Sequence, residues 1–146
     1  MNKYVQIAIL IILAAAVVYL IPHKAAAPAP IVSNPPSPVA TPDVIVDTPQ
    51  PNDLVTSPLT VKGRAMNSWY FEASLPGKLV DAANNVIVQK PFMAVTDWMT
   101  PGYVDFNETL TFSIPATQYG TLIISKDNPS GEPINDASFS VPVRFW

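Results

Sequence analysis

The sequence predicts an all-β protein, an antiparallel sandwich of about seven or eight strands preceded by an N-terminal transmembrane helix. Two observations predict the strands. Apolar and polar residues alternate in several short segments after residue 43, and turn residues separate those segments. An uncharged apolar run near the amino terminus predicts the helix. We therefore expect an anchor (1–24), a proline-rich tether (25–42) and a β-sandwich (43–146).

The anchor is predicted from the run Tyr4 to Ile21, about 18 residues without charge, which as a helix is long enough to cross the hydrocarbon core of a membrane. A cleaved secretory signal is the alternative, because Ala25 and Ala27 have the size and spacing of a cleavage site. However, this apolar core is longer than that of a signal, and Pro28 would follow the cut. We expect an uncleaved signal-anchor that contacts the membrane through residues 4–21.

The orientation of this single span is predicted from what lies on either side of it. The charge bias is weak, since Lys3 precedes the span and Lys24 follows it. Only a few residues precede the span, so the working part of the protein lies after it. We therefore expect a single-pass protein of the cell membrane with its C-terminal domain outside the cytoplasm.

The tether is predicted from its proline content, since nine prolines lie between Pro22 and Pro51. Such a segment holds no helix and does not pair centrally in a sheet. In polyproline II, at about 3.1 Å per residue, a stretch of about 20 residues spans roughly 60 Å. We interpret it as a semi-rigid spacer. The alternative, a proline-rich ligand for a partner's aromatic groove, rests on Pro35-Pro36-Ser37-Pro38, which is also common linker composition.

Two alternating segments open the domain. The segment Pro58 to Ala65 places Leu59, Val61, Gly63 and Ala65 on one side. The segment from Trp69 to Leu75 places Trp69, Phe71, Ala73 and Leu75 inward and Tyr70, Glu72 and Ser74 outward. Pro76-Gly77 then predicts a turn.

Further strands follow the same period of two. The first has Val104, Phe106, Leu110, Phe112 and Ile114 inward. Glu108 interrupts that series, for which we expect a bulge or a local sheet edge. Next comes a strand with Leu122 and Ile124 after Gly120, and the last strand has Ala137, Phe139, Val141, Val143 and Phe145 inward. Pro142 predicts that this last strand lies at an edge.

Shorter candidate strands are Val44 to Val46, Leu79-Val80 and Val86 to Val88, the last two flanking a turn at Asn84-Asn85. Strands with one apolar and one polar face need a second sheet to cover the apolar side, which favours a sandwich over a single open sheet. The length and strand count fit an immunoglobulin-like arrangement.

The domain resembles the immunoglobulin-like domain of bacterial spore germination over nearly all of residues 43 to 146. The combination of Ser57-Pro58-Leu59, Gly63-Arg64-Ala65 and Phe71-Glu72-Ala73 at these separations carries the resemblance. It continues through Val44-Ile45-Val46, Leu79-Val80-Asp81, Phe106, Leu110-Thr111-Phe112, Gly120-Thr121-Leu122 and Val141-Pro142-Val143.

Two segments depart from the family pattern, and both are compatible with the sandwich. Asn84-Asn85 replaces a glycine-containing turn, which Asn tolerates, and Met66 to Tyr70 lengthens the approach to Phe71. The resemblance implies an exported envelope module without catalytic residues. No companion domain accompanies it here, so it carries no inference about sporulation.

Composition excludes several classes of function. From Ala25 onward six basic residues face eleven acidic ones, a net charge of −5, so no basic face suggests nucleic acid. The chain has no cysteine, which excludes disulfides and thiolate zinc sites.

The residues also give little support for chemistry. The only histidine, His23, lies at the membrane edge, so we expect no catalytic triad and no histidine metal site in the domain. A carboxylate pair of Asp97 with Asp105 is conceivable, but scattered acids are usually solvated. The oxygen-rich segment Asp127 to Glu132 lacks the spacing of a calcium loop and is interpreted as a turn. We expect no enzyme, no cofactor and no metal.

Exposed aromatic residues are the better lead to function. Trp98 and Met99 lie in a turn-rich passage outside the clean alternation, and Tyr70 is expected on the outward face of its strand. Trp98 has an alternative role, covering an open end of the sandwich.

Two functions follow from these residues. The first is a non-catalytic envelope module that binds another envelope or extracellular protein. The second is a binder of glycan or peptidoglycan that uses exposed aromatic residues.

Overall fold

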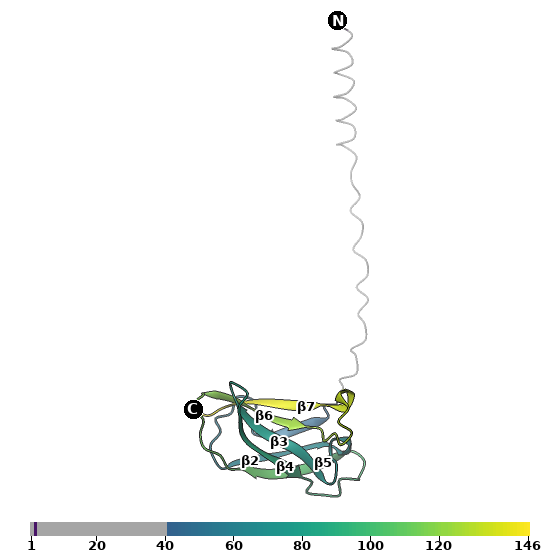
Figure 1. Ribbon diagram of the computed structural model, residues 1–146. Helices are drawn as coiled ribbons and strands as arrows, with labels where there is room; N and C mark the ends of the chain where they lie inside the picture. Colours follow the sequence, from purple (N-terminus) through teal and green to yellow (C-terminus); the bar gives the residue numbers. More distant parts are fainter. Residues whose placement is uncertain (1, 3–40) are drawn as a thin grey trace. The chain divides into compact units, whose positions relative to one another are not determined.

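Seven strands form in the described part of this chain, which in the computed structural model comprises Asn2 and residues 41–146 (Figure 1). They form two antiparallel sheets. One sheet has the order β1-β2-β5, with β1 (Val44–Thr48), β2 (Leu59–Met66) and β5 (Tyr103–Leu110). The other has the order β4-β3-β6-β7, with β3 (Ser74–Asp81), β4 (Val86–Met93), β6 (Tyr119–Ser125) and β7 (Ser138–Arg144). Two short 3-10 helices lie in loops, η1 (Asn67–Trp69) and η2 (Pro133–Asn135). The all-β, immunoglobulin-like sandwich is therefore confirmed.

The alternation in β2 shows why the two layers form. Leu59, Val61, Gly63 and Ala65 are all buried, while the residues between them are exposed. Because every second side chain is apolar, one face of each sheet must be covered, and the other sheet covers it. Val104, Phe106 and Leu110 in β5 and Leu122 and Ile124 in β6 are buried in the same way. These inward assignments are confirmed.

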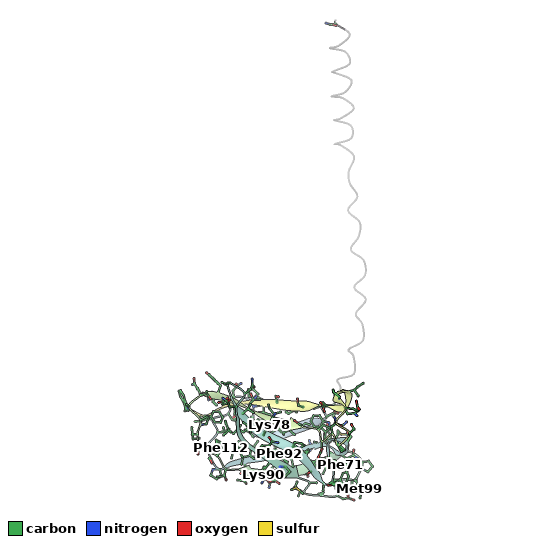
Figure 2. The ribbon with its side chains drawn as sticks, in the orientation of Figure 1. Phe71, Lys78, Lys90, Phe92, Met99 and Phe112 are labelled. Carbon is green, nitrogen blue, oxygen red and sulfur yellow. The ribbon has the colours of Figure 1, made fainter. Side chains whose placement is uncertain are left out.

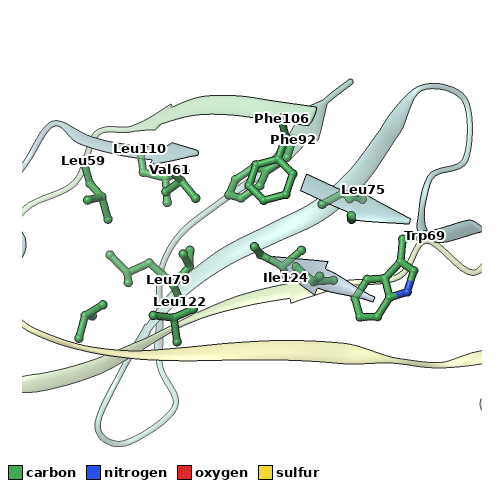
Figure 3. Close-up of a cluster of buried hydrophobic side chains, with 14 of the residues drawn as sticks. Leu59, Val61, Trp69, Leu75, Leu79, Phe92, Phe106, Leu110, Leu122 and Ile124 are labelled. Carbon is green, nitrogen blue, oxygen red and sulfur yellow. The ribbon is translucent and has the colours of Figure 1, made fainter. Parts of the chain in front are cut away.

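The centre of the core is a contact between two rings, one from each sheet. Phe92 of β4 and Phe106 of β5 lie with their ring centroids 5.6 Å apart (Figure 3). Trp69 covers the same cluster from the η1 side. No buried side-chain polar atom in the described residues lacks a hydrogen bond, so the interior is apolar and satisfied.

The segment from Trp69 to Gly77 differs from the prediction. The chain forms η1 and a tight turn at Phe71–Ser74, and β3 then continues through Pro76 and Gly77 instead of turning there. Pro76 fits because it lies opposite Pro91, a pair in which neither residue donates to the ladder, and pairing with β6 begins only at Gly77. Gly77 is needed for close approach, since a Cβ there would lie 2.3 Å from the Phe92 ring. Leu79-Val80 accordingly belongs to β3 and is not a separate strand.

Two other boundaries were also predicted wrongly. β4 does not end at Val88 but runs on to Met93. β5 ends at Leu110, so Phe112 is only partly buried, against the Phe145 ring, and Ile114 is exposed. The turn at Asn84-Asn85 is confirmed, with Asn84 in the left-handed region (φ 64°) and the Asp81 carboxylate accepting the N–H groups of Ala83 and Asn85.

Each of the four edge strands is protected against pairing with another chain. At β1, the Gln50 side chain donates to the carbonyls of Val46 and Asp47. At β7, the segment from Asn52 to Val55 pairs with residues from Pro142 to Arg144, which also confirms Pro142 in an edge strand. The remaining two edges, β4 and β5, face each other. Such devices suppress edge-to-edge aggregation.

The side between β4 and β5 is closed by an ion pair. Lys90 Nζ lies 2.6 Å from Glu108 Oε2, and Glu108 Oε1 accepts the N–H of Met93 at 3.1 Å. Glu108 therefore interrupts the apolar series because β5 is an edge strand, and its register with β2 is continuous, without a bulge. Burial raises the pKa of the Glu108 carboxyl, but hydrogen bonds from Lys90 and Met93 outweigh it and hold the pKa below its ordinary 4.5.

Apart from Asn2, the predicted anchor lies outside the described residues, as do residues 25–40 of the tether. Within the described part of the chain, no helix has the length and hydropathy to span a bilayer.

We expect Glu108→Gln to lower the free energy of unfolding by about 1 kcal/mol at neutral pH, because the charge that pairs with Lys90 is lost. The folded-state pKa of Glu108 lies below its unfolded value, so its contribution is present above the unfolded pKa and disappears as the pH falls through the folded one. Denaturant titrations of the full chain in detergent, at a series of pH values down to about 3, should show wild type and variant converging in acid. Glu72→Gln, at an exposed site without an ion pair in residues 41–146, is the control. A difference in unfolding free energy between wild type and Glu108→Gln that does not change with pH would contradict the stabilising role of the Glu108 charge.

Candidate interaction surface at the loop end

Three loops meet at one end of the sandwich and are joined by backbone hydrogen bonds. Asn67 N–H donates to the Gly102 carbonyl, which ties the β2–β3 loop to the β4–β5 loop. Asp127 N–H donates to the Trp69 carbonyl, which ties the β6–β7 loop to η1. Met66 N–H donates to the Asp43 carbonyl, so the described chain also enters the domain at this end. The loops therefore form one connected surface.

Tyr70 is not where the sequence placed it. The alternation was carried through η1, where the chain is not extended, so Tyr70 and Phe71 were assigned to the wrong sides. Trp69 and Leu75 are buried and Glu72 is exposed, as predicted. Tyr70 is only 5% exposed, and its hydroxyl donates to the Val104 carbonyl at 2.9 Å. Burial, with a smaller effect of the nearby Asp105 carboxylate, raises the pKa of this phenol well above its usual range. Tyr70 is thus a core residue and not an exposed aromatic.

Trp98 and Met99 lie side by side in the chain but in different environments. Trp98 is partly buried and packs against the core cluster, which agrees with its alternative role of covering an open end. Met99 is 68% exposed, and its N–H is held by the Asp97 carboxylate at 3.0 Å. Of the three predicted recognition residues, Met99 is therefore the one displayed to solvent.

The turn at residues 71–74 displays a second apolar residue, Phe71. Phe71 and Ser74 exchange both backbone hydrogen bonds at 3.0 Å, while Glu72 (φ 48°) and Ala73 (φ 62°) lie in the left-handed region. This is the type I′ geometry, which glycine and asparagine normally adopt. For other residues the left-handed conformation costs about 1–2 kcal/mol each. Such strain is concentrated at functional sites.

Strand pairing places Met93 and Phe71 on either side of Ser74. Ser74 pairs with Met93 on one side and with Phe71 on the other, and directly opposite residues project to the same face. Val95 continues from Met93 and donates its N–H to the Asp105 carbonyl at 2.8 Å. All four side chains, of Phe71, Met93, Val95 and Met99, are exposed. We name them, together with Glu72 and Asp97, the loop-end surface; Figure 2 shows Phe71 and Met99 at this end and Phe112 at the other.

The loop-end surface combines apolar and acidic character. The Glu72 and Asp97 side chains are exposed beside Phe71 and Met99 and form no ion pair within residues 41–146. Asp105 of β5 is exposed, and its carbonyl accepts the N–H of Val95. Across the strand pair it lies opposite Arg64, whose guanidinium stacks over the Tyr103 ring at 5.4 Å. Large apolar side chains next to uncompensated carboxylates are suited to binding a partner and not to covering a core.

Sequence reasoning found Met99 but missed Phe71, Met93 and Val95. Phe71 was assigned to the core because the strand was expected to begin before it. Met93 and Val95 were missed because β4 was expected to end at Val88. The sequence did contain a signal for the exposure of Met93. Phe92 is the buried residue at this end of β4, and in a strand the residues on either side of a buried one point outward.

The described residues hold no side-chain cluster suited to metal binding. His23 lies outside them, and residues 41–146 hold no group of three or more His, Asp or Glu side chains that converge on a metal position. The segment from Asp127 to Glu132 is held by its own hydrogen bonds, since Asn128 Nδ2 donates to the Glu132 carbonyl and Asp136 Oδ1, and Ser130 Oγ donates to Asn128 Oδ1. Asp97 is engaged by its own turn and Asp105 projects from β5. A hollow of about 440 Å³ adjoins the loop-end surface, lined by Ser74, Pro76, Gln89, Lys90, Pro91 and Asp127.

Two sheets of three and four strands, with an edge segment pairing in parallel to the last strand, place this domain in the immunoglobulin-like class. The chain belongs to the family of the immunoglobulin-like domain of bacterial spore germination, whose model matches residues 43–132. This confirms the resemblance inferred from the sequence. Neither the curated proteins nor the solved structures yield a match to this chain.

We expect Trp98→Ala to lower the free energy of unfolding by about 2 kcal/mol, because it removes a side chain that packs on the core. Met99→Ala, at the neighbouring exposed position, should change it by less than about 0.5 kcal/mol. Denaturant unfolding followed by tryptophan and far-UV signals measures both. A fully stable Trp98→Ala variant would show that Trp98 does not cover the end of the core.

Proposed function

We propose that this chain is a non-catalytic, membrane-anchored module of the cell envelope that presents its immunoglobulin-like domain outside the cytoplasm to bind another protein. The observation that carries the proposal is the loop-end surface, where a strained turn, the end of β4 and the β4–β5 loop display four apolar side chains to solvent. The uncharged run Tyr4 to Ile21 supports the membrane location, and the family, an immunoglobulin-like domain of bacterial spore germination, supports a bacterial module.

The chemistry of the loop-end surface favours a protein partner over a glycan. Sugar rings are bound by flat, exposed aromatic faces. Tyr70 is buried and Trp98 packs on the core, which leaves Phe71 as the aromatic residue of this surface. The other three side chains, Met93, Val95 and Met99, are aliphatic or thioether groups, and methionine is common at adaptable protein-binding surfaces. Glycan or peptidoglycan binding is accordingly the alternative that the experiment must exclude.

Site-specific photo-crosslinking in intact cells tests the partner. We expect the full chain carrying a photo-crosslinking residue at Met99 to yield a discrete protein adduct, and the same residue at Lys62, exposed in the middle of β2, to yield none. Val95→Asp should abolish the adduct, since it places a charge in the apolar contact. Cosedimentation with purified cell wall is the counter-test. Wall binding that Phe71→Ala abolishes, without a protein adduct, would replace this proposal by the glycan alternative.

Membrane anchoring has its own measurement. We expect the full-length chain to remain in the membrane pellet after alkaline carbonate extraction, which releases peripheral proteins. A variant with two aspartates in the run, Leu13→Asp with Val17→Asp, should lose this retention, because charges at the bilayer centre are costly. A wild-type chain released at full length into the soluble fraction would contradict the anchor.

A further inference from the structure

A second exposed apolar surface lies at the other end of the sandwich, where β6 begins and β7 ends. Tyr119 pairs with Arg144 across β6 and β7, and Leu54 pairs with Arg144 from the edge segment on the other side. Residues paired in this way project to the same face, and Trp146, two residues after Arg144, follows the same direction. Leu54, Tyr119 and Trp146 are 58%, 54% and 59% exposed. We name Leu54, Tyr119, Arg144 and Trp146 the far-end surface.

Arg144 gives the far-end surface a fixed positive charge. Its Nε donates to the Asn52 carbonyl at 3.0 Å, and the backbone of Arg144 pairs with Asp53 and Val55, so the residue is held in place. Within residues 41–146, no carboxylate lies within ion-pair distance of its guanidinium. Arginine flanked by tyrosine and tryptophan is the composition that dominates binding energy at protein interfaces.

The two named surfaces carry opposite charges, at Glu72 and Asp97 on one and at Arg144 on the other. The loop-end surface has apolar side chains beside Glu72 and Asp97, which lack cationic partners in the described residues, and the far-end surface has apolar side chains around an arginine that lacks an anionic one. The two surfaces lie at opposite ends of the sandwich, because β7 runs from the β6–β7 loop at the loop end to Arg144 at the far end (Figure 1). Apolar contact with opposite charges at its margin is what an interface requires.

We propose that the far-end surface of one copy of this chain binds the loop-end surface of a second copy, in a head-to-tail contact. This deepens the proposed function, on which it rests, by naming a second copy as a partner of the loop-end surface. The contact is heterologous, because two different surfaces meet, and each added copy leaves one surface of each kind unoccupied. Association then continues into short rows and is not limited to a dimer.

The predicted tether length allows such a contact between copies anchored in one membrane. A strand of eight residues is about 27 Å long. A proline-rich segment of about 20 residues spans up to roughly 60 Å. A copy displaced by one domain length therefore stays within reach of its own anchor. Its high local concentration at the membrane compensates for a contact of small area.

The absence of cysteine makes a directed crosslinking test possible. Two full-length variants with different tags, Met99→Cys and Tyr119→Cys, are reconstituted together in vesicles of neutral lipid and treated with a short bis-maleimide. We expect mixed-tag dimers from the combination and at least tenfold fewer same-tag dimers from either variant alone. The double variant Met99→Cys with Tyr119→Cys should give a ladder of higher species. Met99→Cys combined with Lys62→Cys, exposed in the middle of β2, is the matched control and should not crosslink.

Charge reversal tests the complementarity itself. Arg144→Glu in the Tyr119→Cys chain should reduce mixed dimers at least tenfold, and so should Glu72→Lys with Asp97→Lys in the Met99→Cys chain. Combining the two reversed chains should restore most of the signal, because opposite charges face each other again. Lys78→Glu, a charge reversal in the middle of the β4-β3-β6-β7 sheet, should have no effect. All these sites are solvent-accessible, and protease resistance of the domain checks that each variant is folded.

The outcomes separate this inference from the proposed function. Mixed dimers that respond to charge reversal support it. Equal crosslinking of Met99→Cys to itself, or no crosslinking in the double variant, would overturn it. If the vesicles give no dimer while Met99 still captures a different protein in cells, the head-to-tail contact is wrong and the proposed function stands; if neither occurs, both fail.

Discussion

The fold depends on two phenyl rings that lie between the sheets, each packed over a glycine of the neighbouring strand in its own sheet. Phe92 lies over Gly77 and Phe106 lies over Gly63, where any Cβ would come within 3 Å of a ring atom. The two rings also contact each other, so each sheet holds the other at the distance that the rings set. Everything else follows from this spacing. β3 must continue without a turn beneath the Phe92 ring. Lys90 of β4 and Glu108 of β5 then lie at the side of the sandwich where these two edge strands face each other, and they form an ion pair there.

The sequence predicts the fold wherever a strand is long and its alternation is uninterrupted. β2, β6 and β7 were found because a period of two over seven or eight residues has few competing explanations. Of the residues predicted inward in these strands, Ala137 is the exception, since it is exposed and precedes β7. The prediction failed between Met66 and Gly77, where a 3-10 turn shifts the inward and outward assignments and a Pro-Gly pair serves packing instead of turning. A Pro-Gly pair can form a turn or allow close packing inside a strand. Here the position of Phe92 on the neighbouring strand decides for packing.

The candidate surfaces were harder to predict than the fold, for a physical reason. Met99 was accessible to sequence reasoning because exposure of a loop residue is a local property. The far-end surface joins Leu54 with Tyr119 and Arg144, residues 65 or more positions apart, and their proximity exists only through the edge pairing of the segment after β1. Tyr70 was wrongly predicted to be exposed. Its hydroxyl donates to the carbonyl of Val104, 34 residues away, and the alternation around Tyr70 cannot reveal that partner.

The protected edges have a consequence for crowding. A protein held at a membrane meets copies of itself at high density, and an open sandwich edge would let their backbones join in a continuous, poorly reversible cross-β stack. Here the Gln50 amide, the Asn52–Val55 segment and the ion pair of Lys90 with Glu108 occupy those backbone groups or place charge beside them. On the proposed membrane anchoring, neighbouring copies would then meet through side chains and not through backbone pairing, which keeps their clustering reversible.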